Sequence, residues 1–181
     1  MGLALISVSS TALVIRYVSI VPALTLAFWR MLTASLLLWL YGLIKKQKPL
    51  SFPNKKRIVF AGVFLGLHFV CFFLGVRHTS IANATLLATL GPVFTSTFSF
   101  FQGKKTPRNV YIGLGVALFG IIMIQYGDLS LSPKNLLGNA LSLLSSLFIA
   151  ITFTTAAEIR KDTENISYGR TLFLIAAITI G

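Results

Sequence analysis

The segment Thr79–Phe101, TSIANATLLATLGPVFTSTFSFF, is the stretch that decides how this chain folds. It runs for 23 residues without a formal charge, which is long enough for a helix to cross a lipid bilayer. At about 100° per residue, its large side chains fall on one arc and its small and hydroxyl-bearing side chains fall on the other. Small residues let helices approach closely in lipid, where the hydrophobic effect does not drive association. The segment is therefore predicted to pack on one side and to meet lipid on the other.

Gly91 and Pro92 lie near the middle of this segment. Proline lacks a backbone N–H and clashes with the preceding turn, so we expect a kink or a short unwound stretch there. We expect one arc to face other helices or a central cavity: Thr85, Ala88, Pro92 and Thr95. We expect the other arc to face lipid or a loosely packed neighbour: Leu86, Leu90 and Phe94.

The composition of the whole chain supports a membrane protein. Hydrophobic residues make up 55% of the 181 residues and charged residues only 11%, whereas a soluble domain has about 25% charged residues. The net charge of +12 could suggest a nucleic-acid partner, but its basic residues are scattered through loops between apolar spans. Nucleic-acid binding requires a folded basic face, so no nucleic-acid partner is expected.

The apolar runs predict an all-α, polytopic bundle of transmembrane helices. Six spans and the start of a seventh are expected at residues 2–18, 23–44, 58–76, 79–101, 110–126, 136–157 and 171–181. The opening residues lack the charged start and the cleavage site of a signal peptide, so we interpret them as the first span. Cys71 is the only cysteine, which excludes an intramolecular disulfide.

The loop charges predict an orientation. Twelve of the sixteen basic residues fall in loops that alternation places on one side, three fall on the other side, and Arg30 lies within a span. Loops rich in Lys and Arg face the cytoplasm. We therefore expect a cytoplasmic amino terminus in a prokaryotic plasma (inner) membrane.

A weak internal repeat divides the chain. ALISVSS at residues 4–10 is similar to ALSLLSS at residues 140–146, and Arg30 and Arg170 then occupy related positions in the next helices. Five spans precede the second copy, so that copy is inserted upside down, as in the inverted repeats of secondary transporters. We expect a first five-helix repeat at residues 1–126 and the start of a second at residues 127–181, truncated within its second helix.

The order of several motifs resembles a known family. AFWRMLTASLLL, GVFLGLHFVCFFLGVRHTSIANATLLATLGPVFTSTFSFF and NVYIGLGVALFGIIMI together resemble the EamA-type transporters of the drug/metabolite transporter superfamily. The resemblance implies a ten-helix permease, built as two inverted five-helix repeats, that moves small metabolites without ATP. Such proteins typically have a Glu shortly after the fourth helix, whereas this chain has Gly103-Lys104-Lys105. A role for that acidic position is therefore not carried over.

Arg30 is the first candidate for a substrate-binding residue. A charge within a span costs about 2.5–3.5 kcal/mol on insertion scales, which favours a partner or a wet cavity. One interpretation is a cation that holds a carboxylate or phosphate of the solute. The other is an arginine that extends to the outer surface, with Trp29, also a candidate binding residue, as an interfacial anchor.

The remaining candidates are polar or small residues within spans. His68 could relay a proton or could only hydrogen-bond a neighbouring helix. Asn83, Thr85 and Thr89 could contact solute or serve packing, and Asn83 could also cap its helix. Gly62 and Gly66 form a G-x-x-x-G packing motif, and Gly91 with Pro92 is the candidate hinge.

These residues predict a secondary transporter that moves a small polar metabolite or drug-like solute by alternating access. A proton or a counter-substrate is the expected coupling partner, and the lipid bilayer surrounds the protein. The sequence is compatible with a homodimer. The alternative is a non-transporting membrane scaffold or assembly subunit. No catalytic residues, metal site or cofactor are predicted, because all four acidic residues lie in loops or at span ends.

Overall fold

The computed structural model describes residues 2–45, 50, 52–103, 107–125 and 133–181, and its regular structure in these ranges is entirely helical. The helices are α1 (Gly2–Tyr17), α2 (Ala23–Ile44), α3 (Phe52–His78), α4 (Ile81–Ala88), α5 (Gly91–Phe101), α6 (Arg108–Gln125), α7 (Pro133–Ile159) and α8 (Asn165–Ile180). The Gly103–Lys105 departure from the family lies mostly outside the described residues.

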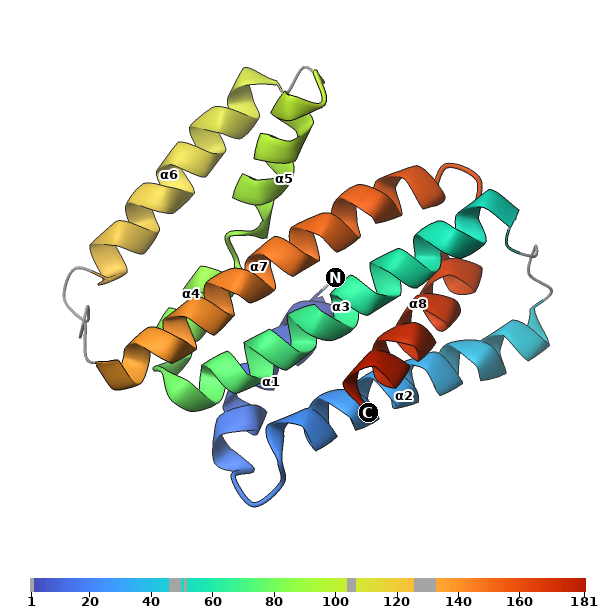
Figure 1. The fold of residues 1–181 in the computed structure, drawn as a ribbon, viewed down its shortest axis with the longest axis horizontal. Coiled ribbons are helices and arrows are strands. Elements are labelled where there is room, and N and C mark those ends of the chain that lie inside the picture. The colour runs from blue at the N-terminus through green and yellow to red at the C-terminus, as the bar shows by residue number, and fades with distance from the viewer. Residues whose placement is uncertain (1, 46–49, 51, 104–106, 126–132) are drawn as a thin grey trace.

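Within the described residues, four stretches are long and apolar enough to cross a membrane. They are α2, most of α3, the combined α4–α5 segment and most of α7, while α8 is a shorter apolar helix. Figure 1 shows α2, α3, α7 and α8 side by side in one bundle, with α5 extending away from it. The described part of the chain is therefore all-helical and has four candidate membrane spans.

The segment Thr79–Phe101 is split into two helices. α4 ends at Ala88, and α5 begins at Gly91 with Pro92 in its first turn. Between them, the N–H of Leu90 bonds to the carbonyl of Leu87 at 3.3 Å, and the N–H of Val93 bonds to Leu90 at 2.9 Å. These tight i to i−3 bonds replace the α-helical pattern around a proline that cannot donate.

The helix that corresponds to the seventh predicted span, α8, starts earlier than the sequence predicted. α8 begins at Asn165 rather than near Thr171, so the polar residues 165–170 belong to the helix and not to a loop. Ser167 and Gly169 are buried, and the hydroxyl of Ser35 in α2 donates a 2.8 Å bond to the Arg170 carbonyl. This packing against α2 stabilises a first turn that hydropathy alone assigns to solvent.

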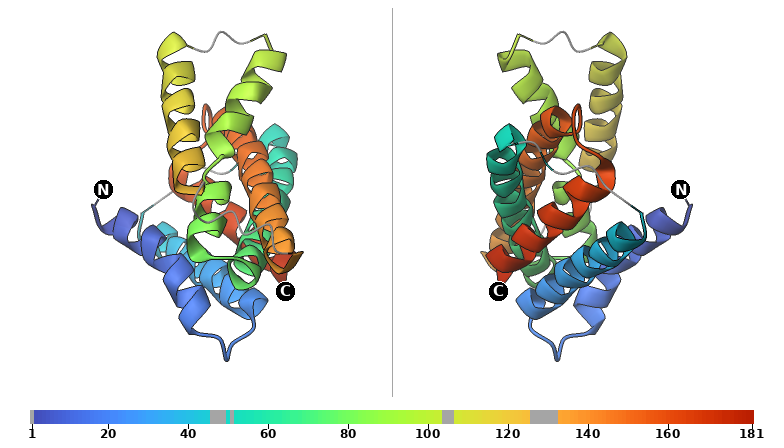
Figure 2. Two further views of the ribbon diagram at one scale, coloured as in Figure 1. Left: turned by 90° about the vertical axis from the view of Figure 1, so that its left-hand side faces the viewer. Right: turned by 90° about the vertical axis from the view of Figure 1, so that its right-hand side faces the viewer.

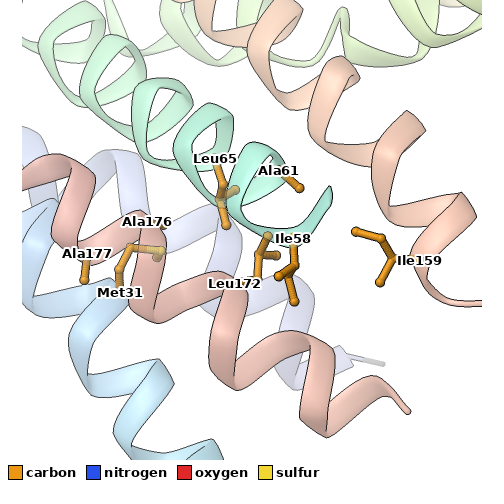
Figure 3. Packing of buried hydrophobic residues seen from close by; sticks show 8 residues of the cluster. All are labelled: Met31, Ile58, Ala61, Leu65, Ile159, Leu172, Ala176 and Ala177. Atoms are coloured by element: carbon orange, nitrogen blue, oxygen red, sulfur yellow. The ribbon is translucent and has the colours of Figure 1, made fainter. Parts of the chain in front are cut away.

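α3 is the central helix, with α7 on one side and α8 on another (Figure 1). A cluster of buried apolar side chains joins α2, α3, α7 and α8 (Figure 3): Met31, Ile58, Ala61, Leu65, Ile159, Leu172, Ala176 and Ala177. A second cluster, which includes Ile15, Ala27, Phe73 and Ala84, joins α1 and α4 to the same central helix.

Glycines on α3 and α7 set how closely these helices approach. A Cβ on Gly62 would lie 2.7 Å from the Ile175 Cβ of α8, and a Cβ on Gly66 would lie 2.7 Å from the Thr179 Cβ. A Cβ on Gly138 of α7 would likewise lie 2.6 Å from the backbone carbonyl carbon of His78. The G-x-x-x-G motif of α3 therefore forms the closest part of the α3–α8 contact.

The α5–α6 arm extends away from the bundle, as both views in Figure 2 show. α5 packs on α7, where Gly91 lies against Ile149, but α6 makes few contacts with the other described helices. A Cβ added at Gly113, Gly115 or Gly120 would meet nothing within 4 Å. The core that positions polar residues is therefore built from α1–α4, α7 and α8.

Candidate functional site

Arg30 lies eight residues into α2 and extends toward α1. Its Nη1 donates a 2.7 Å hydrogen bond to the hydroxyl of Thr11, and its Cζ lies 5.5 Å from the centre of the Phe69 ring in α3. The side chain is partly buried, and no described carboxylate forms an ion pair with it. A guanidinium has five N–H donors, so this arrangement leaves donors for an anionic group.

His68 links α3 to α7. Its Nδ1 lies 2.8 Å from the carbonyl oxygen of Ser145. A carbonyl only accepts, so Nδ1 must carry the proton, and Nε2 is the acceptor of the neutral ring. The imidazole meets the Phe69 ring edge-on at 4.9 Å and stacks on Phe72 at 6.1 Å.

The Phe69 ring lies next to both polar groups. Arg30 approaches it from α2, while His68 precedes it on α3 and bonds to α7. We define the Arg30 site as the five side chains gathered here: Thr11, Arg30, His68, Phe69 and Phe72. It combines a cation, a hydrogen-bond acceptor and apolar rings, which are groups that can contact a polar solute with an anionic group.

Trp29 does not share this site. Its side chain is 58% exposed, and its ring contacts Phe28 edge-on at 5.6 Å. Successive residues on a helix point about 100° apart, so Trp29 faces outward while Arg30 faces α1. Trp29 therefore lies on the outer face of α2, away from the Arg30 site.

Asn83, Thr85 and Thr89 form no described hydrogen bond with Arg30 or His68. Asn83 is buried, and its backbone N–H is capped by the Ser80 hydroxyl at 3.1 Å. Thr85 donates to the Ile81 carbonyl at 2.7 Å, and the exposed Thr89 donates to Leu86 at 2.7 Å. Both hydroxyl protons are therefore used within their own helix.

The two predicted arcs of the α4–α5 segment are less distinct than expected. Ala84 and Gly91 are buried on the side of small residues, but Pro92 is exposed rather than packed. Leu86, Leu90 and Phe94 are partly buried, as are Thr85, Ala88 and Thr95. The helical hydrogen-bond pattern is interrupted between α4 and α5, so one continuous helical wheel does not describe both.

Several buried polar residues of α7 were not named as candidates from the sequence. Ser142 and Ser145 are fully buried, and each hydroxyl donates a 2.8 Å bond to a carbonyl of its own helix. Near the start of α7, Asn139 accepts a 2.7 Å bond from the Thr79 hydroxyl. The spacing of small polar residues in GNALSLLSS was the signal, because it places them on one helix face.

Arg16 and Arg77 connect helices at one end of the bundle, and the basic loops lie at the other end. Arg77 donates to the carbonyls of Val18, Ser19 and Val21, at 2.8, 3.1 and 2.7 Å, in the α1–α2 turn. Arg16 donates in return to the Val76 carbonyl at the end of α3, at 3.2 Å. These bonds satisfy carbonyls of the α1–α2 turn and of the last turn of α3, which have no partner within a helix, so both arginines have a structural explanation.

Comparison with known proteins gives consistent matches. The chain is 33% identical over 114 residues to the pseudopaline exporter CntI of Pseudomonas aeruginosa, which covers 62% of this chain and 40% of that protein. It is 27% identical over 137 residues to an uncharacterized transporter of Helicobacter pylori, covering 74% of this chain and 45% of the relative. A similar match, 29% over 133 residues, is found with an uncharacterized transporter of Archaeoglobus fulgidus. The chain thus spans less than half the length of these relatives, and no solved structure matches it significantly.

The EamA-like transporter family matches residues 1–126, which include α1 to α6 and all five residues of the Arg30 site. The match extends across both the split α4–α5 segment and the glycine-rich α6. This chain is an integral membrane protein that belongs to the EamA-like transporter family.

Proposed function

We propose that the protein is a secondary transporter that moves a small polar metabolite or drug-like solute across the membrane by alternating access. The observation that carries this proposal is Arg30, a cation within a span that no described carboxylate neutralises. Such a residue is costly in a bilayer unless it serves a cavity or a ligand. We propose that Arg30 binds an anionic group of the solute.

The relatives support transport as the general activity. One of them is named as an exporter of pseudopaline, and others are named only as transporters. We propose the same class of activity for this chain and leave the direction to experiment. We expect that the transported solute can be recognised because its flux depends on the Arg30 site.

We further propose that α7 and α8 begin a second, inverted repeat, with residues 1–126 as the first repeat and 127–181 as the start of the next. Support comes from how α2 packs against α8. The guanidinium of Arg170 lies 4.3 Å from the Trp39 ring, near the end of α2, whereas Gly181 lies beside Phe28 at the beginning of α2. The two helices are therefore antiparallel, as an inverted pair would be.

His68 is the group that we propose for coupling to a proton or a counter-substrate. Its Nδ1–H is held by the Ser145 carbonyl, so Nε2 is the atom that can take up a proton. We propose an amino terminus in the cytoplasm of a prokaryote, because the basic loops favour that side. The bilayer and a small solute are the proposed partners, and a homodimer is compatible with the exposed α6.

A flux assay tests the proposal. The protein is reconstituted in liposomes and offered a panel of small anionic, neutral and cationic metabolites, with empty liposomes as the control. We expect saturable uptake or release of at least one anionic solute. A complete absence of flux would favour the scaffold alternative, which is supported by Thr85 and Thr89, whose hydroxyls serve only their own helix.

A further inference from the structure

A cavity at the end of the bundle that carries the basic loops lies apart from the Arg30 site. It has a volume of about 380 Å³ and is lined by side chains from α3, from α7 and from the residue that follows α5: Arg57, Gln102, Thr154, Thr155 and Glu158. Arg57 lies near the start of α3, Gln102 follows α5, and the other three lie near the end of α7. The cavity therefore opens where α5 separates from α3 and α7.

The charges of this cavity favour an anion. Glu158 is paired with Lys161 at 2.6 Å, so its charge is already compensated. Arg57 is exposed and has no described ion pair or hydrogen bond. Thr154 and Thr155 donate their hydroxyl protons to their own helix, at 2.8 and 2.9 Å. The donors that remain for a ligand are the guanidinium of Arg57 and the amide of Gln102, which suit a phosphate group.

An apolar seam continues from this cavity toward the middle of the bundle. Arg57, Phe60 and Phe64 follow one another at helical spacing on the same face of α3. The rings of Phe60 and Phe64 are 4.6 Å apart, and the Phe64 ring meets the Phe148 ring of α7 at 5.6 Å. Phe60 is 49% exposed. The end of the seam at Phe60, next to the cavity, is therefore accessible from outside the bundle.

We propose that this cavity binds the phosphate of an anionic phospholipid, with an acyl chain lying along the Phe60–Phe64–Phe148 seam. A zwitterionic headgroup would bring a second cation to a site whose only described carboxylate is paired with Lys161. A soluble phosphate would leave the apolar seam unused. Basic pockets between transmembrane helices are suited to anionic headgroups, and this site does not depend on the solute path.

Lipid binding to the purified protein tests this site. Delipidated protein is titrated with phosphatidylglycerol or phosphatidylcholine of the same acyl chains, and binding is followed by native mass spectrometry. We expect phosphatidylglycerol to bind more tightly, and Arg57→Gln to weaken it roughly fivefold to tenfold. Lys56→Gln is the matched control, an exposed neighbour outside the cavity, and should change the affinity less than about twofold.

Further arms separate the lipid from other sources of phosphate. Phe60→Ala should weaken phosphatidylglycerol binding, and Arg57→Lys, which keeps the charge, should retain most of it. Glycerol 3-phosphate at millimolar concentration should not displace the lipid. Equal binding of both lipids, equal losses in Arg57→Gln and Lys56→Gln, or displacement by glycerol 3-phosphate would each overturn the proposal. Unfolding temperatures of all variants show whether a loss of binding reflects a loss of fold.

Discussion

At the scale of single residues, two arginines within the helices, Arg30 and Arg170, share one feature. Arg30 lies over the Phe69 ring and Arg170 lies over the Trp39 ring, at 5.5 and 4.3 Å. A cation over an aromatic face gains about 0.5–2 kcal/mol, more when water is excluded. The aromatic rings therefore offset part of the cost of burying each guanidinium where no described acid pairs with it.

The sequence predicted that Arg30 would need a partner, but it did not identify the partner. Thr11 and Phe69 come from two other helices, and no spacing rule connects positions so far apart in the chain. Trp29 shows the converse problem, because hydropathy cannot tell which side of α2 faces the bundle. In a membrane the outer side of a helix faces lipid, and an apolar side chain is compatible both with lipid and with the interior of the bundle.

Arg77 gives a prediction at this scale. Arg77→Gln removes hydrogen bonds to the carbonyls of Val18, Ser19 and Val21. Bonds from charged donors contribute about 1.5–3 kcal/mol each where they are not shared with water, so the free energy of unfolding in detergent should fall by roughly 1–3 kcal/mol. Arg108→Gln, at an exposed position at the start of α6, is the control and should have little effect. Equal stability of the two variants would show that the turn does not depend on Arg77.

At the scale of helices, hydropathy predicted the extent of α2 correctly, from Ala23 to Ile44. The Gly91-Pro92 pair, not hydropathy, indicated the break in Thr79–Phe101, since proline acts through local backbone geometry. It misplaced the start of α8, because Ser167 and Gly169 are polar or small yet buried against neighbouring helices. Local chemistry could be read from the sequence, whereas packing between distant segments could not.

The α3–α8 contact leads to a prediction for Gly66. Gly66→Val places atoms where the Thr179 Cβ and the Ala176 carbonyl now lie, at 2.7 and 3.0 Å from an added Cβ. Overpacking of this kind costs about 1–3 kcal/mol, and the unfolding temperature should fall. Gly115→Val adds the same atoms in open space on α6. Only the first variant should lose stability, and a similar loss in both would point to helix propensity rather than packing.

The break between α4 and α5 gives a second prediction at this scale. Pro92→Ala restores a backbone N–H that can bond to the Ala88 carbonyl, so the two helices should join. We expect slower amide hydrogen exchange at residues 88–93, with little change in exchange elsewhere. Unchanged exchange in this stretch would mean that tertiary contacts, such as that of Gly91 with Ile149, hold the break open.

At the scale of the whole molecule, α3 organises the bundle and α6 stands largely apart from it (Figure 1). The bundle joins the helices of residues 1–126 to α7 and α8, so the proposed two repeats pack into one another rather than side by side. The overall class followed from composition, which indicated a membrane protein, and from the apolar runs, which predicted helices. The position of α8 against α2 and α3 did not, because it depends on close contacts at Gly62, Gly66 and Gly169.

The proposed orientation can be tested with single cysteines. In a Cys71→Ser background, Ser19→Cys lies in the α1–α2 turn and Lys55→Cys lies near the start of α3, at opposite ends of the bundle. Both native side chains are exposed. In intact cells, a membrane-impermeant maleimide should label position 19 and should reach position 55 only after permeabilisation. The reverse pattern would place the amino terminus outside.

The most direct test of the central proposal compares solute flux through Arg30→Gln with flux through Arg108→Gln. Both variants remove one positive charge, but only Arg30 is partly buried against Thr11 and Phe69. Loss of an ionic contact to a bound anion costs roughly 2–3 kcal/mol, or about 30-fold to 150-fold in affinity. We predict that Arg30→Gln loses saturable flux of the anionic solute while its fold is retained, and that Arg108→Gln transports normally. Normal flux through a folded Arg30→Gln protein would contradict the account.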